Sequence, residues 1–402
     1  MRIVGGIYNE RSVFPEDDVI YGSGGRAAAA LSLMNPDTTL TSFVGQNRRH
    51  DIEYHVKEIW NLKLDAYAVP EIVSFTYYHG LSSPIIRPTR LPVNDAPEIR
   101  VSDDVILQFG MLEGIAVVNG SRVIYDPQNP ERPERFDANC STAKELAYVL
   151  NRGEAYKLTG QEDTAQAAKV LLDQPNVIVV VVKSGANGAK VYTATTTDHV
   201  AAYATNNVWP IGSGDVFAAA FAHFWGTVKT SPVEAARYAS RAAALYCGRK
   251  QIPLHREVLM GADFIFPLLK PTRKPSDATI YLAGPFFTMS QLWLVEEART
   301  ALRNAGFNVF SPYHDVGIGD ADKVVPADIQ GIEDADVMLA LCDGLDAGTL
   351  FEIGYAVKKG LPVVAFGEQT SDEAMKMLYG TKCKVFRDFT SAIYHAQWEA
   401  LA

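Results

Sequence analysis

The chain has 402 residues, more than one hydrophobic core usually organises, so about two or three domains are expected. Hydrophobic residues make up 48% and charged residues 21%, an ordinary globular composition that excludes disorder and fibrous repeats as the main theme. The net charge of -10 argues against nucleic acid and against a membrane surface as partners. We therefore expect a small-molecule substrate.

Cysteine usage and the apolar runs predict a cytoplasmic protein. The chain has 4 cysteines, far apart in sequence and without a C-x-x-C pair, which is typical of reduced thiols. The start of the chain, Met1–Gly6, lacks the apolar core of a signal peptide. The longest apolar run, Val177–Val182, is far short of the roughly 20 residues of a membrane helix and indicates a buried strand.

Residues 1–268 are predicted to form the first domain. Short β-branched runs alternate there with alanine-rich stretches, which is typical of helices packed around a mostly parallel sheet. The expected strands are Ile3–Ile7, Val105–Gln108 and Val177–Lys183, and the expected helices are Arg26–Met34 and Val216–Trp225. The aromatic and proline-rich segment Phe75–Arg90 indicates a small strand pair or a lid.

Residues 269–277 are predicted to be a linker, and residues 278–402 a second domain. Two prolines and three basic residues interrupt the apolar pattern in the linker. Beyond it we expect the strands Thr279–Pro285 (with its turn), Phe307–Phe310, Val337–Leu341 and Val363–Phe366, and the helices Gln291–Ala305 and Gly348–Lys359. A segment of this length can form one compact flavodoxin-like parallel sheet.

The strongest motif in the first domain is Gly212-Ser213-Gly214-Asp215, which directly precedes an apolar helix. A glycine-rich turn that opens a helix directs backbone N–H groups and the positive end of the helix dipole at an anion such as phosphate. Asp215 is then placed to accept a proton from a hydroxyl that attacks a γ-phosphate. The alternative is that Asp215 is a helix N-cap and the glycines form only a tight turn.

Together with segments elsewhere, this motif resembles the signature of the ribokinase-like (PfkB) carbohydrate and nucleoside kinases. The matching segments contain the di-glycine Gly24-Gly25, the pair Asn151 and Glu154, and the turn residues Ser184, Gly185 and Gly188. The resemblance implies a three-layer α/β/α domain that binds ATP and Mg²⁺, with Glu154 organising the metal and Glu10 standing about where a sugar-binding Asp would be. An asparagine usual after the di-glycine is missing, so an inert domain that binds a nucleoside or acts as a scaffold is the alternative.

In the second domain, Asp346 and Glu352 follow the apolar strand Val337–Leu341. A loop and a helix start would hold both carboxylates at the carboxyl edge of a sheet, where open α/β folds bind ligands. Glu352 lies in an otherwise apolar helix turn, and a buried carboxylate is costly unless it is paired or used. The alternative is an N-cap Asp346 with a partly solvated Glu352.

Three separated motifs here resemble the nucleoside 2-deoxyribosyltransferases, in order and in spacing. They contain Tyr281 and Gly284, then Asp328, then Asp346, Gly348 and Glu352. The resemblance implies that Glu352 is the nucleophile at the anomeric carbon, that Tyr281 lies beside it, that Asp346 helps to hold the sugar and that Asp328 handles the base. Gly284 and Gly348 would border the substrate, and no cofactor is implied for this domain.

The combined reading is an enzyme of nucleoside metabolism. It would cleave or exchange the N-glycosidic bond of (2'-deoxy)nucleosides through a glutamate nucleophile and carry an ATP-dependent sugar or nucleoside kinase-like domain. We expect a nucleoside, a nucleobase or a sugar as substrate, no nucleic acid, no membrane, and a homo-oligomer. The first alternative is a nucleoside or nucleotide N-glycoside hydrolase whose kinase-like domain only binds nucleotide, and the second is a regulatory protein without catalysis.

Overall fold

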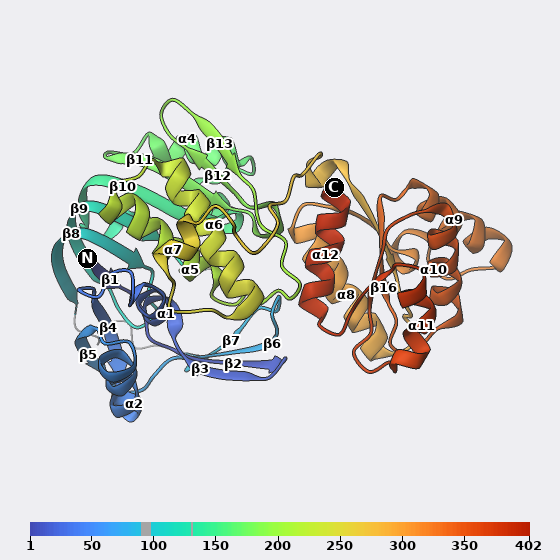
Figure 1. Ribbon diagram of the computed structural model, residues 1–402, viewed down its shortest axis with the longest axis horizontal. Coiled ribbons are helices and arrows are strands. Elements are labelled where there is room, and N and C mark those ends of the chain that lie inside the picture. The colour runs from blue at the N-terminus through green and yellow to red at the C-terminus, as the bar shows by residue number, and fades with distance from the viewer. Residues whose placement is uncertain (90–97, 130–131) are drawn as a thin grey trace. The chain divides into compact units, whose positions relative to one another are not determined.

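The computed structural model describes residues 1–89, 98–129 and 132–402 of the chain. It divides into two compact units, each with its own sheet and helices (Figure 1). We call residues 1–205 and 209–268 the N-terminal unit, and residues 206–208 and 269–402 the C-terminal unit. No helix in the described ranges is both long enough and apolar enough to cross a membrane.

A nine-stranded sheet forms the centre of the N-terminal unit. Its strands, in spatial order, are β13 (Thr197–Val200), β12 (Ala189–Tyr192), β11 (Val177–Lys183), β10 (Thr142–Asn151), β9 (Ala116–Asp126), β8 (Ile99–Phe109), β1 (Arg2–Val4), β4 (Thr39–Gly45) and β5 (Lys63–Val69). All neighbours pair in parallel except at β12, which is antiparallel to β11 and to β13. The carboxyl ends of β1, β8, β9, β10 and β11 therefore meet at one edge of the sheet.

Helices cover both faces of this sheet. The helices of the unit are α1 (Gly22–Leu31), α2 (Arg49–Tyr54), α3 (Arg152–Thr159), α4 (Thr164–Leu172), α5 (Ser213–Phe221), α6 (Pro232–Arg249) and α7 (Arg256–Met260). Ala147 and Val149 of β10 pack with α1, α5 and α6, whereas Leu146 and Tyr148 pack with α3 and α4. This alternation follows from the two-residue period of a strand and gives the three-layer α/β/α arrangement that the sequence predicts.

A second, small sheet in the N-terminal unit has the strand order β3 (Asp17–Ile20), β2 (Asn9–Phe14), β6 (Ser74–His79) and β7 (Ile85–Arg87). The strand pair predicted in Phe75–Arg90 corresponds to β6 and β7, which are antiparallel. Arg90 lies outside the described residues. A lid function for this segment stays a prediction.

The C-terminal unit is a five-stranded parallel sheet between two layers of helices. Its strand order is β15 (Asn308–Phe310), β14 (Thr279–Ala283), β16 (Val337–Leu341), β17 (Val363–Phe366) and β18 (Lys384–Phe386). Its helices are α8 (Met289–Asn304), α9 (Ala321–Asp334), α10 (Ala347–Lys359), α11 (Asp372–Gly380) and α12 (Phe389–Leu401). This is the 2-1-3-4-5 order of the flavodoxin-like fold. Its ligand crevice lies between β14 and β16, where the strand order reverses.

The predicted element bounds agree best with the structure where a strand is a continuous apolar run. β11, β16 and β17 have the predicted bounds. The first helix differs, because α1 begins at Gly22 and ends at Leu31, not at Arg26 and Met34. Glycine is needed in this first turn, since a Cβ atom on Gly24 would lie 2.5 Å from the carbonyl oxygen of Gly5. The first strand also ends early, at Val4, before Gly5 and Gly6.

Candidate functional sites

The first candidate site surrounds the N-terminus of α5. Gly212 precedes the helix with φ 78°, and a Cβ atom there would lie 2.2 Å from the guanidinium carbon of Arg26. Glycine is thus needed both for the left-handed backbone and for space. Asp215 is 6% exposed and lies in the first turn, and because the N-cap residue is Gly212, the alternative of Asp215 as the cap does not hold.

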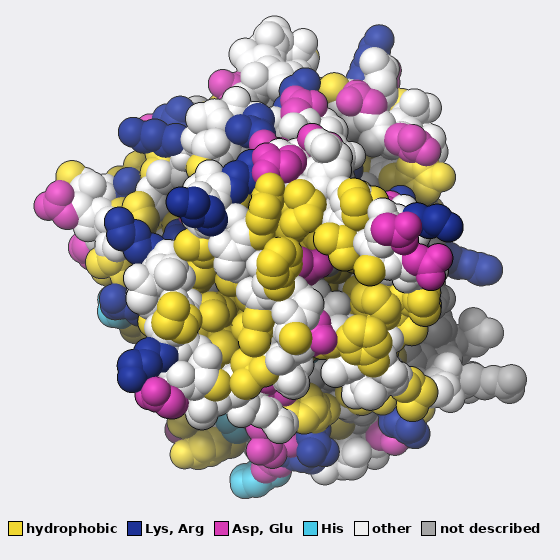
Figure 2. Space-filling model, turned by 90° about the vertical axis from the view of Figure 1, so that its right-hand side faces the viewer, with side chains coloured by type: hydrophobic (Ala, Val, Ile, Leu, Met, Phe, Trp, Pro, Cys, Tyr) yellow, Lys and Arg dark blue, Asp and Glu magenta, His cyan; other side chains and the backbone are white. Residues whose placement is uncertain are grey.

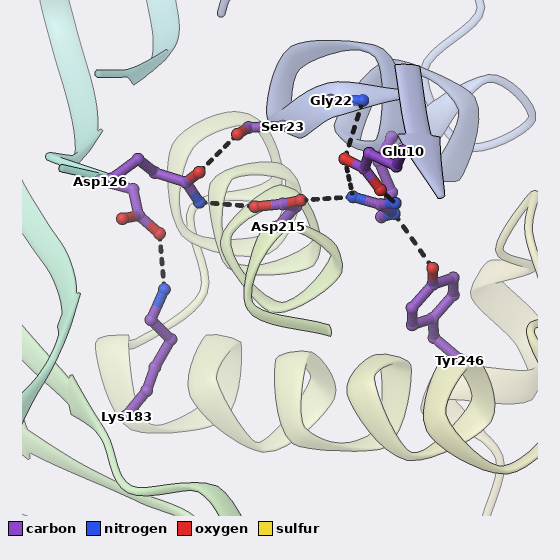
Figure 3. Close-up of polar contacts among 9 residues, drawn as sticks. Glu10, Gly22, Ser23, Asp126, Lys183, Asp215 and Tyr246 are labelled. Atoms are coloured by element: carbon purple, nitrogen blue, oxygen red, sulfur yellow. Dashed lines mark hydrogen bonds and ion pairs between the residues drawn. The ribbon is translucent and has the colours of Figure 1, made fainter. Parts of the chain in front are cut away.

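Asp215 takes part in a buried network built around Arg26, which is only 1% exposed (Figure 3). Nη1 of Arg26 donates to Oδ2 of Asp215 at 2.8 Å, and Nε donates to the hydroxyl of Tyr246 at 3.0 Å. Arg26 also forms an ion pair with Glu10, which in turn accepts the N–H of Gly22. Nε2 of Gln128 donates to Oδ1 of Asp215 at 2.5 Å. Both oxygens of the Asp215 carboxylate therefore have a donor.

Arg26 was not among the candidate residues from the sequence, although a signal was present. It is the single charged residue in the glycine- and alanine-rich run of α1. A guanidinium at a helix position that must be buried needs carboxylate partners. Burial disfavours the charge of Arg26, but Glu10, Tyr246 and Asp215 outweigh this and raise its pKa.

A second cluster gathers the ends of three adjacent strands. Asp126 ends β9, Asn151 ends β10 and Lys183 ends β11, and Asn151 is paired in register with Lys183. Nζ of Lys183 lies 2.5 Å from Oδ2 of Asp126 (Figure 3). Asn151 and Glu154 form a capping box at the start of α3, so these two residues have a structural role in addition to any ligand role.

Burial changes the acid–base properties of this second cluster. It raises the pKa of Asp126 to about 7, where Lys183 opposes the effect and Glu154 adds to it. It also raises the pKa of Glu154, again opposed by Lys183. A cluster that holds this much negative charge in a buried place is suited to a cation, a phosphate with its counterion, or a proton.

Ser184, Gly185 and Gly188 form the turn that follows β11. The N–H of Ser184 donates to the carbonyl of Gly188 at 2.7 Å. Gly188 has φ 75°, and a Cβ atom on it would lie 2.1 Å from the carbonyl oxygen of Val200 in β13. Of the expected sugar-binding glycines, Gly24 packs on Gly5, while a Cβ atom on Gly25 would have room, with the nearest atom of Trp60 at 3.5 Å. Gly24 is therefore also required by packing.

The residues of the N-terminal unit fit Mg²⁺ bound with a phosphate. Mg²⁺ usually takes one or two protein carboxylates and completes its shell with water and phosphate oxygens. Glu154 is a buried carboxylate of this cluster and is 7% exposed. No group of three or more metal-binding side chains occurs in the described part of the chain. Glu154 would therefore hold the ion only together with a bound phosphate.

The second candidate site lies in the C-terminal unit, beside the point between β14 and β16 where the strand order reverses. The hydroxyl of Tyr281 on β14 donates to Oε1 of Glu352 on α10 at 2.9 Å. Burial raises the pKa of Glu352 to about 7; the bond from Tyr281 lowers it, and the nearby Asp328 and Asp346 raise it. Three carboxylates and a phenol from β14, α9 and the start of α10 thus come together.

The two aspartates of this site differ in how they are held. Asp346 is the N-cap of α10, and its Oδ2 accepts the N–H of Thr349 at 2.8 Å. Asp328 has an Oδ1 atom that is buried and has no partner within the described residues, and burial raises its pKa. Asp346 is thereby fixed in orientation, whereas Asp328 keeps an unused oxygen and a tendency to hold a proton.

Small residues shape the same site. A Cβ atom on Gly284 would lie 3.0 Å from Leu341, and one on Gly348 would lie 3.0 Å from Oδ2 of Asp346. The ring of Tyr281 stacks on Phe310, with centroids 5.4 Å apart. Phe310 can pack there because Gly331 has no side chain, since a Cβ atom on Gly331 would lie 2.4 Å from its ring. Phe310 and Gly331 were not predicted, because only the fold brings them next to Tyr281.

Exposed apolar side chains are frequent in the C-terminal unit. Figure 2 shows them gathered near the middle of one face, with acidic side chains among them. The largest exposed fractions belong to Met289 (89%), Ile318 (87%), Met377 (74%), Phe287 (70%) and Phe351 (62%). Phe351 immediately precedes Glu352 in α10.

Two family models match the chain, one in each unit. Residues 115–252 match the pfkB family carbohydrate kinase, and residues 280–386 match nucleoside 2-deoxyribosyltransferase. Both resemblances expected from the sequence are thereby confirmed. The chain joins a kinase-like domain to a deoxyribosyltransferase-like domain.

Several solved structures that are similar to this chain cover about two thirds of it. A ribokinase from Thermotoga maritima is 18% identical, with 64% of this chain and 96% of that chain covered and a TM-score of 0.44. A putative ribokinase II from E. coli in complex with ATP and Mg²⁺ is 16% identical, with coverages of 63% and 93% and a TM-score of 0.46. A pyrophosphate-dependent kinase of the ribokinase family is 13% identical, with coverages of 64% and 98% and a TM-score of 0.45. No curated protein sequence matches the chain.

Proposed function

We propose that the C-terminal unit cleaves or exchanges the N-glycosidic bond of (2'-deoxy)nucleosides, with Glu352 as the nucleophile. The observation that carries this proposal is the 2.9 Å hydrogen bond from Tyr281 to a mostly buried Glu352, next to Asp328. A carboxylate held this way can face the anomeric carbon of a sugar and stabilise the positive charge that develops there.

We propose a reaction in two steps. An oxygen of Glu352 forms a bond to the anomeric carbon while the carbon–nitrogen bond to the base breaks, and the electron pair stays on the base nitrogen. Asp328 in its protonated form gives that nitrogen a proton. In transfer, a nitrogen of an incoming base attacks the anomeric carbon, Glu352 leaves as carboxylate, and Asp328 takes the proton back. If water attacks instead, the same residues hydrolyse the substrate.

The matching role for the N-terminal unit is phosphoryl transfer to a sugar or nucleoside hydroxyl, with Asp215 as the base. Arg26 forms an ion pair with Asp215, with 2.8 Å between Nη1 and Oδ2, and so holds the carboxylate in place. ATP would bind at the N-terminus of α5 and the turn of Ser184, and Mg²⁺, held by Glu154 and the phosphates, would neutralise charge on the transferring group. The acceptor hydroxyl would then donate to one of the Asp215 oxygens.

A second candidate function keeps the N-glycosidic chemistry, as hydrolysis of nucleosides or nucleotides, but makes the N-terminal unit a nucleotide-binding domain without transfer. The observation that favours it is that Gln128 and Arg26 already donate to both oxygens of Asp215. A substrate hydroxyl would have to share or replace one of these bonds. ATP binding without ATP consumption, in a protein that releases free base, would support this second function.

We further propose that copies of the chain associate through the exposed apolar side chains of the C-terminal unit. Exposed apolar patches of this kind commonly mark protein contacts. Phe351, which precedes the proposed nucleophile Glu352 in α10, is one of these exposed side chains.

The decisive experiment incubates the purified chain with 2'-deoxynucleosides, ribonucleosides and their monophosphates, an acceptor base, ATP and Mg²⁺, and follows products by mass spectrometry. We expect Glu352→Ala to lower base exchange or release by roughly a thousandfold or more. Asp215→Ala should leave that activity intact and remove only phosphorylated products, so each variant is the control for the other. A chain that neither exchanges nor releases any base would overturn the proposal.

A further inference from the structure

Lys183 has no role in the chemistry proposed above, yet it lies at the centre of the kinase-like site. Its side chain is 15% exposed, and a Cβ atom placed on Gly214 would lie 3.3 Å from its Nζ atom. Gly214 belongs to the first turn of α5. The ammonium of Lys183 therefore lies directly beside the N-terminus of this helix.

A cation is unfavourable at this position unless negative charge compensates it. The N-terminus of a helix carries a partial positive charge of its own, so an ammonium there adds like charge to like. Burial also disfavours the charge of Lys183; Asp126, Glu154 and Asp215 outweigh it, and its pKa is raised. The ammonium and the helix end point at the same place, an arrangement suited to a phosphate with more than one negative charge.

Asp126 is an incomplete partner for this ammonium. Its Oδ2 accepts from Lys183 at 2.5 Å, but its Oδ1 is buried and has no partner within the described residues. Permanent buried ion pairs normally have their remaining lone pairs satisfied, because desolvation otherwise exceeds the attraction. An anion with more negative charge can therefore displace Asp126 from Lys183 at low cost; Figure 3 shows the pair.

We propose that Lys183 is a phosphate-binding residue of the donor site, which Asp126 holds in place until a phosphate reaches the N-terminus of α5. This proposal rests on the proposed donor binding by the N-terminal unit. On binding, the ammonium of Lys183 donates to a phosphate oxygen and gives up its bond to Oδ2 of Asp126. Asp126 therefore competes with the ligand, and Lys183 and Asp126 have opposite effects on affinity.

The test measures binding of adenylyl imidodiphosphate with Mg²⁺ to the full chain by isothermal titration calorimetry. Lys183→Met should weaken binding by about tenfold or more, because a charge-assisted bond is lost, and Lys183→Arg should restore most of it. Asp126→Asn should tighten binding, and this gain should shrink when Lys183 is methionine, as a double-mutant cycle would show. Lys190→Met, at an exposed position on the adjacent strand β12, is the matched control and should bind as the unchanged chain does.

The outcomes separate this proposal from the one on which it depends. If the unchanged chain does not bind the analogue, donor binding by the N-terminal unit fails, and the role of Lys183 fails with it. If the unchanged chain binds but Lys183→Met binds equally well, or if Asp126→Asn weakens binding, only the role of Lys183 is overturned. Should Lys183→Met not fold, the double variant with Asp126→Asn removes both buried charges, and comparison with Asp126→Asn alone gives the effect of Lys183.

Discussion

At the residue scale, burial and the hydrogen bond from Tyr281 act in opposite directions on the pKa of Glu352 and so on the pH at which it can react. Burial favours the protonated carboxyl, whereas the hydrogen bond from Tyr281 favours the carboxylate. Glu352 is left with a pKa of about 7, which leaves it partly ionised at neutral pH. A nucleophile needs the ionised form, so the two opposing effects set its activity.

The first prediction at this scale concerns pH and Tyr281→Phe. For the unchanged chain, kcat/KM for base release should rise with a midpoint near pH 7 as Glu352 ionises, and fall again at higher pH as Asp328 loses the proton that it gives to the base. Tyr281→Phe removes the bond that stabilises the carboxylate, so the midpoint should move to higher pH. Initial rates between pH 5 and 9 measure both effects.

Tyr355→Phe, on the same helix as Glu352, is the matched control for this experiment. The hydroxyl of Tyr355 contacts Glu333 and not Glu352. Its profile should coincide with that of the unchanged chain. A midpoint that stays in place in Tyr281→Phe would show that the phenol does not act on the nucleophile.

At the element scale, the N-terminus of α5 is shaped by one glycine and one arginine. Gly212 has positive φ and lies against the guanidinium of Arg26, so α5 can begin there only without a side chain. Arg26 in turn comes from α1, on the same face of the sheet. The start of one helix is thus adjusted to a side chain from another.

The prediction at this scale compares Gly212→Ala with Gly160→Ala. Gly160 ends α3 with φ 71° and has nothing within 4 Å of an added Cβ atom. Its replacement should cost about 1 kcal/mol of stability, from the positive φ alone. Gly212→Ala carries the same backbone cost and in addition displaces Arg26, so the loss should be about 2 to 4 kcal/mol.

Thermal unfolding followed by circular dichroism measures this difference. Gly212→Ala should also lose ATP-analogue binding, whereas Gly160→Ala should keep it. Equal loss of stability in the two variants would mean that Arg26 moves aside without cost and that its packing against Gly212 does not require glycine.

At the scale of the whole molecule, three carboxyl groups from separate segments of the chain have raised pKa values. Burial raises the pKa of Glu113, Asp126 and Glu352 to about 7. Between their ordinary pKa near 4 and about 7, the folded chain therefore binds more protons than the unfolded chain. Stability from these groups is present at low pH and is lost as pH rises through the raised pKa.

The prediction at this scale is that the chain unfolds at a higher temperature at pH 6 than at pH 8. Each group changes the free energy of unfolding by at most about 1.4 kcal/mol per pH unit, so a difference of several degrees is expected, with about 2 to 4 °C per kcal/mol. Glu352→Gln removes one of the three groups and should reduce the difference. Differential scanning calorimetry at both pH values measures it, and a transition that is higher at pH 8 would contradict the argument.

The elements that the sequence predicted best are those whose signal is local. Continuous apolar runs located β11, β16 and β17 with correct bounds, because a strand covered on both faces must be apolar throughout. Strands β2 and β3 of the small sheet were not predicted, since they are short and polar. Their register depends on β6, which lies far along the chain.

The candidate sites also contain residues with a local signal in the sequence and residues without one. By itself, the sequence determined the two domains, their resemblances and the motifs around Asp215 and Glu352, because a glycine turn or a carboxylate in an apolar helix is visible within a few residues. Only the tertiary structure decided that Arg26 lies between Glu10 and Asp215, and that Lys183 meets Asp126 across β10. These pairs join residues on different elements that are 16, 57 and 189 positions apart, and the parallel sheet that brings the elements together leaves no local trace of its strand order.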